Sequence, residues 1–564
     1  MTKRGVVGVV GGLACALLVG CGGNEAVAPG PKSPFPSREA LDAIASAPLA
    51  EVPVRKVVSP PTWEVELGTE APGFTAAAVE GKWKERMGEE ARAPFAPELR
   101  CVAHELARVL VEHGAEPDER LQRLILRGCG FTSPNFTAIT RTLSEVPESA
   151  TDAQVLDALV RPDKAEVPLL YRGSPMGVGI VRSGKRAVLV VARGRTPEPA
   201  TFSAPDANGK VTVTLRAPLE NARALAFINQ GDAGVRACDG EAAEPGSHRW
   251  SCSMAEGDKH AWIDVVAVPN GLVLARLVAQ GLARREPGPL PYRSLPSTAP
   301  TSPDGMSRAI LEGLNARRVA AHMAPLTLAQ QQSAGDHTRL APHFFHAELV
   351  GDEQKANQVA LGLLAGWGVE GTIGGGGFFG FLLSGTTDAS RWLESAMETP
   401  SSRICFFDKD ARQVAIGVSA LGTLGGVGAV VSTYSFYEST DHTDDARRYM
   451  ARIEKARLEK GLSKPDRWGS GPGLKAQVAK LYRRELSPTD ALEEAMASEN
   501  ERTEKTVFGT VIEATSVDDA PIDPRMLSAG NVSVMVEITH QKAAGAPWGR
   551  LLILVLGFPR PASK

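Results

Sequence analysis

The chain of 564 residues lacks several features that would identify common functions. Basic residues are not in excess, since 62 Lys and Arg stand against 65 Asp and Glu, and this balance argues against nucleic acid as a partner. No CxxC, HExxH, GxSxG or Walker P-loop pattern occurs, so paired zinc-binding cysteines, a zincin helix, a hydrolase nucleophile elbow and a phosphate loop are not indicated. Hydrophobic residues make up 43%, enough for several globular domains.

Long apolar runs are also absent beyond the first 20 residues. Lys3 and Arg4 precede an apolar stretch from Gly5 to Gly20, which is shorter than the roughly 20 residues of a membrane-spanning helix and typical of an export signal. Residues 1–20 are therefore expected to be a signal peptide.

The end of this signal, Leu18-Val19-Gly20-Cys21, resembles a bacterial lipoprotein box. The resemblance implies lipidation of Cys21, with the membrane as partner of the anchored chain. An ordinary signal peptide with an incidental cysteine is the alternative. Glycine rather than aspartate follows Cys21, and by resemblance to enteric sorting this favours the outer membrane, at its periplasmic face or at the cell surface.

Cysteines are few, seven in all, and an exported protein meets an oxidising compartment. Cys238 and Cys252 flank a turn-rich segment, and Cys101 and Cys129 lie on two successive predicted helices. We expect the disulfides Cys238–Cys252 and Cys101–Cys129. Cys405 is left over and is expected to be a buried apolar residue.

Composition and periodicity divide the mature chain into an α+β arrangement of several units. Residues 21–97 are rich in Pro and Ala and are expected to be a tether with little fixed structure. The remaining segments are helices followed by a β-hairpin at 98–195, a β-sandwich at 196–283, a Pro-rich linker at 286–304, and helix-then-strand units at 305–438 and 441–564.

Residues 307–438 resemble the CAP superfamily (cysteine-rich secretory proteins, antigen 5 and pathogenesis-related proteins, also called SCP domains) in its bacterial form. The motifs that carry the resemblance are Leu314-Asn315-Ala316-Arg317-Arg318, Pro325-Leu326-Thr327-Leu328, Phe344-Phe345-His346, Arg391-Trp392-Leu393, Thr399-Pro400-Ser401-Ser402-Arg403 and Val414-Ala415-Ile416-Gly417-Val418. The resemblance implies an α-β-α sandwich and covers about a quarter of the chain.

Family members often hold a divalent metal with two His and two Glu in a cleft. Here Ser402 stands where the family pattern has a histidine. The other positions match His346 or, in a shifted alignment, His343, with Glu370 and Glu394 as the nearest glutamates. One His and one Glu do not supply the three or four ligands that tight metal binding needs, so no metal and no cofactor is expected.

The 441–564 segment is either a second, divergent copy of this unit or an unrelated unit with the same order of elements. Ile453, Arg457 and Gly461 follow the spacing of Leu314, Arg318 and His322. Residues 176–191 also resemble the hairpin that closes the 305–438 unit.

Three functions remain open. The leading hypothesis is a lipid-anchored envelope protein that binds an apolar small molecule, an envelope component or a protein in its cleft, without turnover. Gly374–Gly377 is expected to be a flexible loop of that cleft, Phe378–Leu383 could line an apolar groove, and Arg403 could hold an anion.

The first alternative is a hydrolase, such as a peptidase, with His346 as base beside Glu370 or Glu394. The second is an envelope scaffold that binds a glycan or a protein through the β-sandwich.

Overall fold

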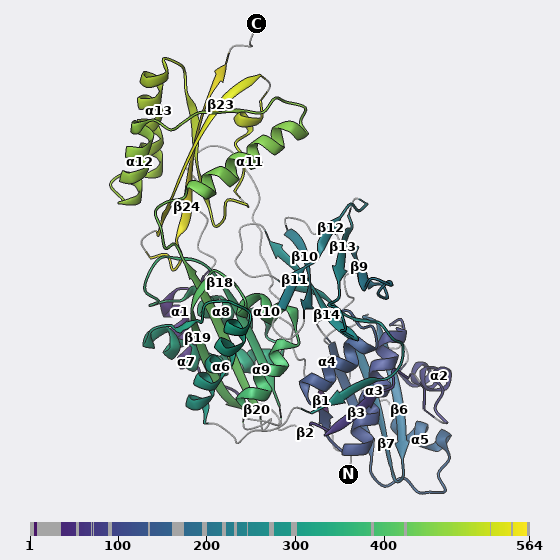
Figure 1. The fold of residues 1–564 in the computed structure, drawn as a ribbon. Coiled ribbons are helices and arrows are strands. Elements are labelled where there is room, and N and C mark those ends of the chain that lie inside the picture. Colours follow the sequence, from purple (N-terminus) through teal and green to yellow (C-terminus); the bar gives the residue numbers. More distant parts are fainter. Residues whose placement is uncertain are drawn as a thin grey trace.

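The described residues form three mixed α/β units and a β-sandwich, an α+β architecture (Figure 1). The computed structural model describes residues 5–7 and 35–560 apart from 52–55, 69, 72, 88–92, 134–135, 161–173, 195–199, 217–221, 231–233, 245, 270–275, 295–301, 385–387, 422–425, 519, 529 and 543–544. Cys21 lies outside the described residues. We name the parts the N-terminal unit (76–194), the β-sandwich (200–284), the middle unit (303–436) and the C-terminal unit (443–560).

The middle unit contains a four-stranded sheet in the order β17-β19-β20-β18. Its elements are α6 (Pro303–Ala320), β17 (Thr327–Leu328), α7 (Gln331–Val350), α8 (Glu353–Ala365), β18 (Ile373–Leu383), α9 (Ala389–Met397), α10 (Pro400–Phe406), β19 (Ala411–Leu421) and β20 (Gly426–Phe436).

Both faces of this sheet are covered by helices. One core joins α6, α9 and α10 to alternate strand residues such as Phe379 and Val431, and the other joins α7 and α8 to the residues between them, such as Phe378 and Val430. Strands buried on both faces need near-continuous apolar sequence, which β20 has.

The C-terminal unit repeats this order of elements and strands, with the sheet order β21-β23-β24-β22. Its elements are α11 (Thr443–Glu459), β21 (Asp466–Arg467), α12 (Pro472–Tyr482), α13 (Pro488–Thr503), β22 (Phe508–Ala514), the 3₁₀ helix η3 (Pro524–Leu527), β23 (Asn531–Gln541) and β24 (Arg550–Arg560). Residues from α11 and η3 share a core with one face of the sheet, and residues from α12 and α13 share a core with the other.

A buried arginine holds the same place in both units. The Arg318 Nε donates to Ala324 O at 2.9 Å and its Nη1 to Phe406 O at 2.6 Å. The Arg457 Nε donates to Ser463 O, also six residues on, at 2.8 Å. Both side chains are fully buried, and each ties the end of its helix to the loop before the strand that follows.

The N-terminal unit has its sheet in the order β1-β5-β7-β6. Its elements are α2 (Ala76–Met87), α3 (Pro97–His113), α4 (Glu119–Gly128), β5 (Phe136–Leu143), α5 (Asp152–Leu159), β6 (Met176–Ser183) and β7 (Arg186–Gly194). The core with α3 and α4 lies on one face, and the core with α2 and α5 on the other. The short strand β1 (Gly5–Val7), from the expected signal sequence, pairs with β5.

The β-sandwich consists of two four-stranded sheets in the orders β11-β10-β14-β15 and β12-β13-β9-β8, whose inner faces share one core. Its strands are β8 (Ala200–Phe202), β9 (Lys210–Leu215), β10 (Ala222–Gln230), β11 (Gly234–Ala237), β12 (Asp239–Glu241), β13 (His248–Ser253), β14 (His260–Pro269) and β15 (Arg276–Arg284).

Both expected disulfides are present in the structure. Cys101–Cys129 joins α3 to the end of α4, and Cys238–Cys252 joins the segment between β11 and β12 to β13. Cys405 is free and buried.

From residue 35 onward, the segment that was expected to be a tether forms helices and strands. This segment forms α1 (Arg38–Ser46), β2 (Val57–Val58), β3 (Thr62–Val65) and α2. Although proline is frequent, Leu41 packs against the middle unit and Trp63 against the N-terminal unit, so apolar side chains order the segment by finding partners elsewhere in the chain. The expected linker likewise contains a strand, β16 (Leu290–Arg293), which pairs with β3.

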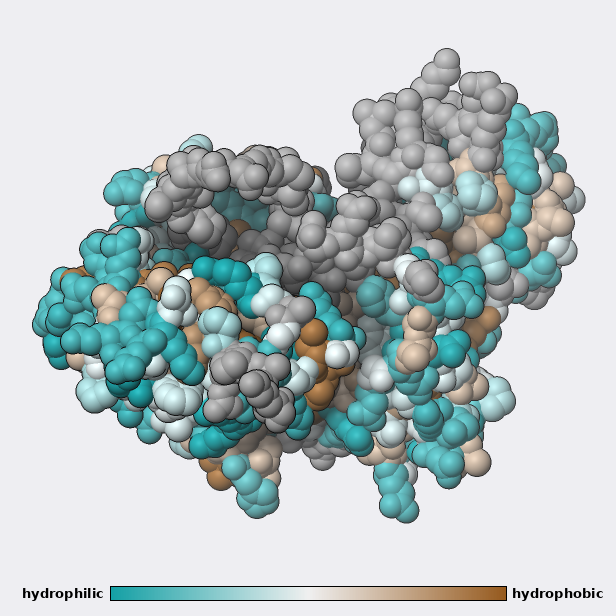
Figure 2. Space-filling model, turned by 90° about the horizontal axis from the view of Figure 1, so that it is seen from above, coloured by the Kyte–Doolittle hydropathy of each residue, from teal (hydrophilic) through white to brown (hydrophobic). Residues whose placement is uncertain are grey.

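Figure 2 shows a largely hydrophilic face on which hydrophobic residues form small patches. Among the described residues, no helix has the length and apolar character needed to cross a bilayer. In Figure 1 the C-terminal unit stands above the middle unit, and the β-sandwich lies over the N-terminal unit beside it.

Candidate functional site at the junction of three units

The two candidate histidines of α7 contact the N-terminal segment rather than an open cleft. The His346 Nε2 donates to Ala50 O at 3.1 Å. His343 is buried, and a hydrogen bond involving the backbone of Ala45 is among the influences on its imidazole, whose pKa is lowered mainly by burial. His337 lies earlier on the same helix. Its Nδ1 is 2.8 Å from Ser333 O, and its Nε2 is 2.8 Å from Ser432 Oγ of β20. These imidazoles therefore tie elements together.

The two candidate glutamates do not join His346. Glu394 lies on α9 and is ion-paired with Arg317 of α6, whereas α7 covers the opposite face of the sheet. Glu370 is exposed at the turn before β18. No group of three or more His, Cys, Asp or Glu side chains that could hold a metal occurs in the described part of the chain.

Ser402 and Arg403 have structural contacts. The Ser402 hydroxyl donates within the turn that begins α10, with Thr399 O at 2.8 Å, and is fully buried. The Arg403 Nε donates to Met397 O at 2.6 Å and its Nη1 to Gly234 O at 2.7 Å. The arginine thus joins α10 to the β-sandwich through carbonyl groups instead of offering the anion site expected from sequence.

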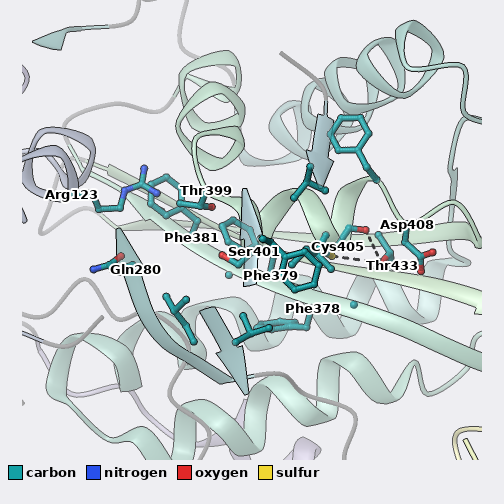
Figure 3. Close-up of a pocket in the computed structure, with 18 of the residues that line it drawn as sticks. Arg123, Gln280, Phe378, Phe379, Phe381, Thr399, Ser401, Cys405, Asp408 and Thr433 are labelled. Atoms are coloured by element: carbon teal, nitrogen blue, oxygen red, sulfur yellow. Dashed lines mark hydrogen bonds between the residues drawn. The ribbon is translucent and has the colours of Figure 1, made fainter. Parts of the chain in front are cut away.

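A cavity of about 540 Å³ lies where the N-terminal unit, the β-sandwich and the middle unit meet. We call it the junction cavity. Its walls are α4 and the start of β5, the sandwich strands β10, β11, β14 and β15, the middle-unit strands β18 and β20, and α10 with the residues on either side of it. Figure 3 shows Arg123 and Gln280 at one end of the lining residues, and Asp408 and Thr433 at the other.

The β18 side of the cavity is apolar. Phe378, Phe379 and Phe381 line it together with the glycines among them. Gly374–Gly377 is not the flexible loop that the sequence predicted, because the pairing of β18 with β20 continues through Gly375–Gly377. A Cβ on Gly376 would lie 2.4 Å from Thr433 O, so this strand needs glycine, and the missing side chains leave space beside the phenylalanines.

Polar groups converge at the α4 end. The Arg127 Nη2 donates to Asp264 Oδ1 at 3.0 Å, and its Nε donates to Gln280 Oε1 at 3.0 Å. The other Asp264 oxygen accepts from Ser401 N at 3.1 Å. The Arg127, Asp264 and Gln280 side chains are buried, and with Ser401 they join all three parts that surround the cavity. Within the described chain, the Arg127 Nη1 is buried and has no hydrogen-bond partner.

Arg123 lies next to Arg127 on the cavity wall. Its guanidinium stacks over Phe381 at 4.5 Å and donates to Ser395 O at 2.9 Å. Burial lowers the pKa of Arg123 to about 10, so the group is still charged at neutral pH. Its nearest carboxylate is Glu398 at 3.8 Å, which is also ion-paired with Arg120.

The phenylalanines of this site were predicted from the sequence as a possible apolar groove, whereas the arginines and the β-sandwich wall were not predicted. One signal was available, because Arg120, Arg123 and Arg127 follow helical spacing along α4. No pattern in the sequence indicated that this face would meet β14 and β18, since these contacts join residues more than 130 positions apart.

No family model matches the chain, and no curated protein matches it. Two solved structures show a weak, partial likeness. An extracellular SCP-domain protein from Bacillus anthracis has 10% identity and a TM-score of 0.19, with 42% of this chain and 89% of that chain covered. A cysteine-rich secretory protein from Staphylococcus aureus has 8% identity and a TM-score of 0.18, with coverages of 46% and 84%.

Proposed function

We propose that this protein is a lipid-anchored member of the CAP superfamily in the bacterial envelope, and that it binds an apolar small molecule in the junction cavity. The observation that carries the binding function is the cavity itself. At about 540 Å³ it falls within the usual 300–1,000 Å³ range of small-molecule sites, which are mostly apolar with a few placed polar groups.

The contacts of the candidate catalytic residues favour binding over turnover. A general base must lie within hydrogen-bond reach of its partners. His346 instead donates to a backbone carbonyl of the N-terminal segment, and Glu394 pairs with Arg317 on the other side of the sheet. Glycan or protein binding by the β-sandwich stays a prediction.

Filling the cavity tests this function. Val235 and Ala237 of β11 line the cavity, whereas Arg236 between them does not and its side chain is 55% exposed. We expect saturable binding of the neutral fluorophore N-phenyl-1-naphthylamine to the full chain. V235W should weaken it at least about tenfold by occupying the space that the probe needs, and R236W should not. The proposal would be refuted if the probe showed no saturable binding, or if V235W and the wild type bound it equally well.

Lipid anchoring at Cys21 is a separate part of the proposal and rests on the signal pattern of residues 1–21. Cells that express the full chain should incorporate labelled palmitate into it, and C21A should abolish the labelling. Because Cys15 lies in the segment that the signal peptidase would remove, C15A should leave the labelling intact. Equal labelling of C21A and the wild type would disprove this part.

A further inference from the structure

We infer that the junction cavity takes a single-chain amphiphile with a carboxylate head, and that the head docks on the Nη1 of Arg127. This inference rests on the proposed function and names its ligand class. The apolar β18 wall would receive the chain, and the α4 end would receive the anion.

Arg127 has an unused hydrogen-bond donor. A guanidinium has five N–H donors. In Arg127 the Nε group is bound to Gln280 and Nη2 to Asp264, while Nη1 is buried without a partner among the described residues. Arg127 is 3% exposed and lines the cavity. A buried charged donor without an acceptor is costly, and a carboxylate in the cavity would satisfy it.

The cavity wall is cationic at its α4 end. Both charged side chains that line this end, Arg123 and Arg127, are positive. Their ion-pair partners, Glu398 at 3.8 Å and Asp264 at 3.0 Å, are not among the described residues that line the cavity, and neither is the buried Asp118 beside Arg120. An anionic ligand would therefore meet two cationic groups in the wall, whereas a cationic ligand would be repelled.

The cationic and the apolar walls of the cavity lie at different positions along it. Arg123 and Gln280 stand at one end of the cavity in Figure 3, and Phe378 and Phe379 lie farther along it. Asp408 lies at the far end in Figure 3, and Lys409, the next residue along the chain, also lines the cavity, so these neighbours offer one group of each sign. The excess of positive groups is therefore confined to the α4 end, which orients the ligand.

Displacement of N-phenyl-1-naphthylamine from the full chain by dodecanoate and by dodecanol at pH 8 tests the inference. The two competitors have the same chain length and differ in head-group charge. We expect dodecanoate to bind at least about tenfold more tightly, as a charge-assisted hydrogen bond predicts. In R127M this preference should fall to within about threefold, because the charged donor is lost.

Because R127M leaves Asp264 buried without its main partner, it could fail to fold. The double variant R127Q/D264N removes both charges and keeps hydrogen-bonding groups at both positions, and it should lose the acid preference in the same way. Equal affinity for the acid and the alcohol in wild type, or a preserved preference in R127Q/D264N, would overturn the inference while the proposed function stands. Failure of the probe and of both competitors to bind would refute the proposed function itself.

Discussion

At the scale of single residues, glycine determines how closely helices approach the sheets. A Cβ on Gly417 of β19 would lie 2.2 Å from His337 O of α7, and a Cβ on Gly179 of β6 would lie 2.4 Å from His104 N of α3. Both sites place a helix backbone against a strand, with a buried histidine on the helix. The similar runs around these glycines are visible in the sequence, but the helix that packs on each of them is not.

We predict that G417A destabilises the protein by about 3 kcal/mol or more, because the new methyl group would force α7 away from the sheet. G81A is the control. Gly81 lies in α2 with open space around its Cα, so alanine there should stabilise by up to about 1 kcal/mol. Urea unfolding monitored by circular dichroism measures both changes. A G417A protein as stable as wild type would contradict the close contact.

At the scale of elements, the sequence predicted most helices and the closing hairpins, because these have clear apolar periodicity. It missed β18, whose glycines looked like a loop, and α8, which is needed to cover the second face of the middle sheet. It also could not place the helices on faces, so His346 and Glu394 seemed available to each other. Periodicity shows which face of an element is apolar but not which partner covers it.

The contact between α4 and the end of β18 predicts a pH dependence. Glu119 of α4 accepts from Ser384 N at 2.6 Å, and burial raises its pKa to about 7. The folded state thus favours the protonated carboxyl. The contribution of Glu119 to stability is fully present below the ordinary pKa near 4.5 and is lost as pH rises toward 7.

E119Q should remove this loss, since the amide mimics the protonated acid at every pH. We expect E119Q to be more stable than wild type at pH 8 and similar to it at pH 4.5, as measured by thermal unfolding. E112Q, at an exposed position of α3, should follow wild type at both values. If E119Q and the wild type showed the same dependence of stability on pH, titration of Glu119 would be ruled out as its cause.

At the scale of the whole molecule, the three α/β units share one arrangement. In each, a short parallel pairing precedes a helix, and the three longest strands follow in the same neighbour order. We propose that they are copies of one CAP-like unit, with the β-sandwich inserted after the first. The equivalence of Arg318 and Arg457 could be predicted from their matching spacing in the sequence. The junction cavity was not, because its walls come from three separate parts of the chain.

The N-terminal segment predicts another whole-molecule property. Leu41 of α1 is 3% exposed and occupies a gap above Gly362 of α8, where a Cβ would lie 2.1 Å from the leucine Cδ2. L41D should release the segment, because it would bury a carboxylate among apolar groups. Trypsin should then cleave faster at Arg38 and Lys56. L49D is the matched control, since Leu49 is 40% exposed; equal cleavage of the two variants would contradict the docking.

This course of the chain has a consequence for anyone who wishes to study the middle unit by itself. A fragment cut at its apparent borders would lose α1, which covers α8, and Trp548, whose Nε1 donates to Leu364 O at 3.2 Å. It would also lose Glu119, which accepts a hydrogen bond from Ser384 N directly after β18. Such a fragment would expose apolar surfaces that are buried in the intact protein. Any self-association or nonspecific binding of the fragment would then result from the truncation and would not be a property of the intact protein.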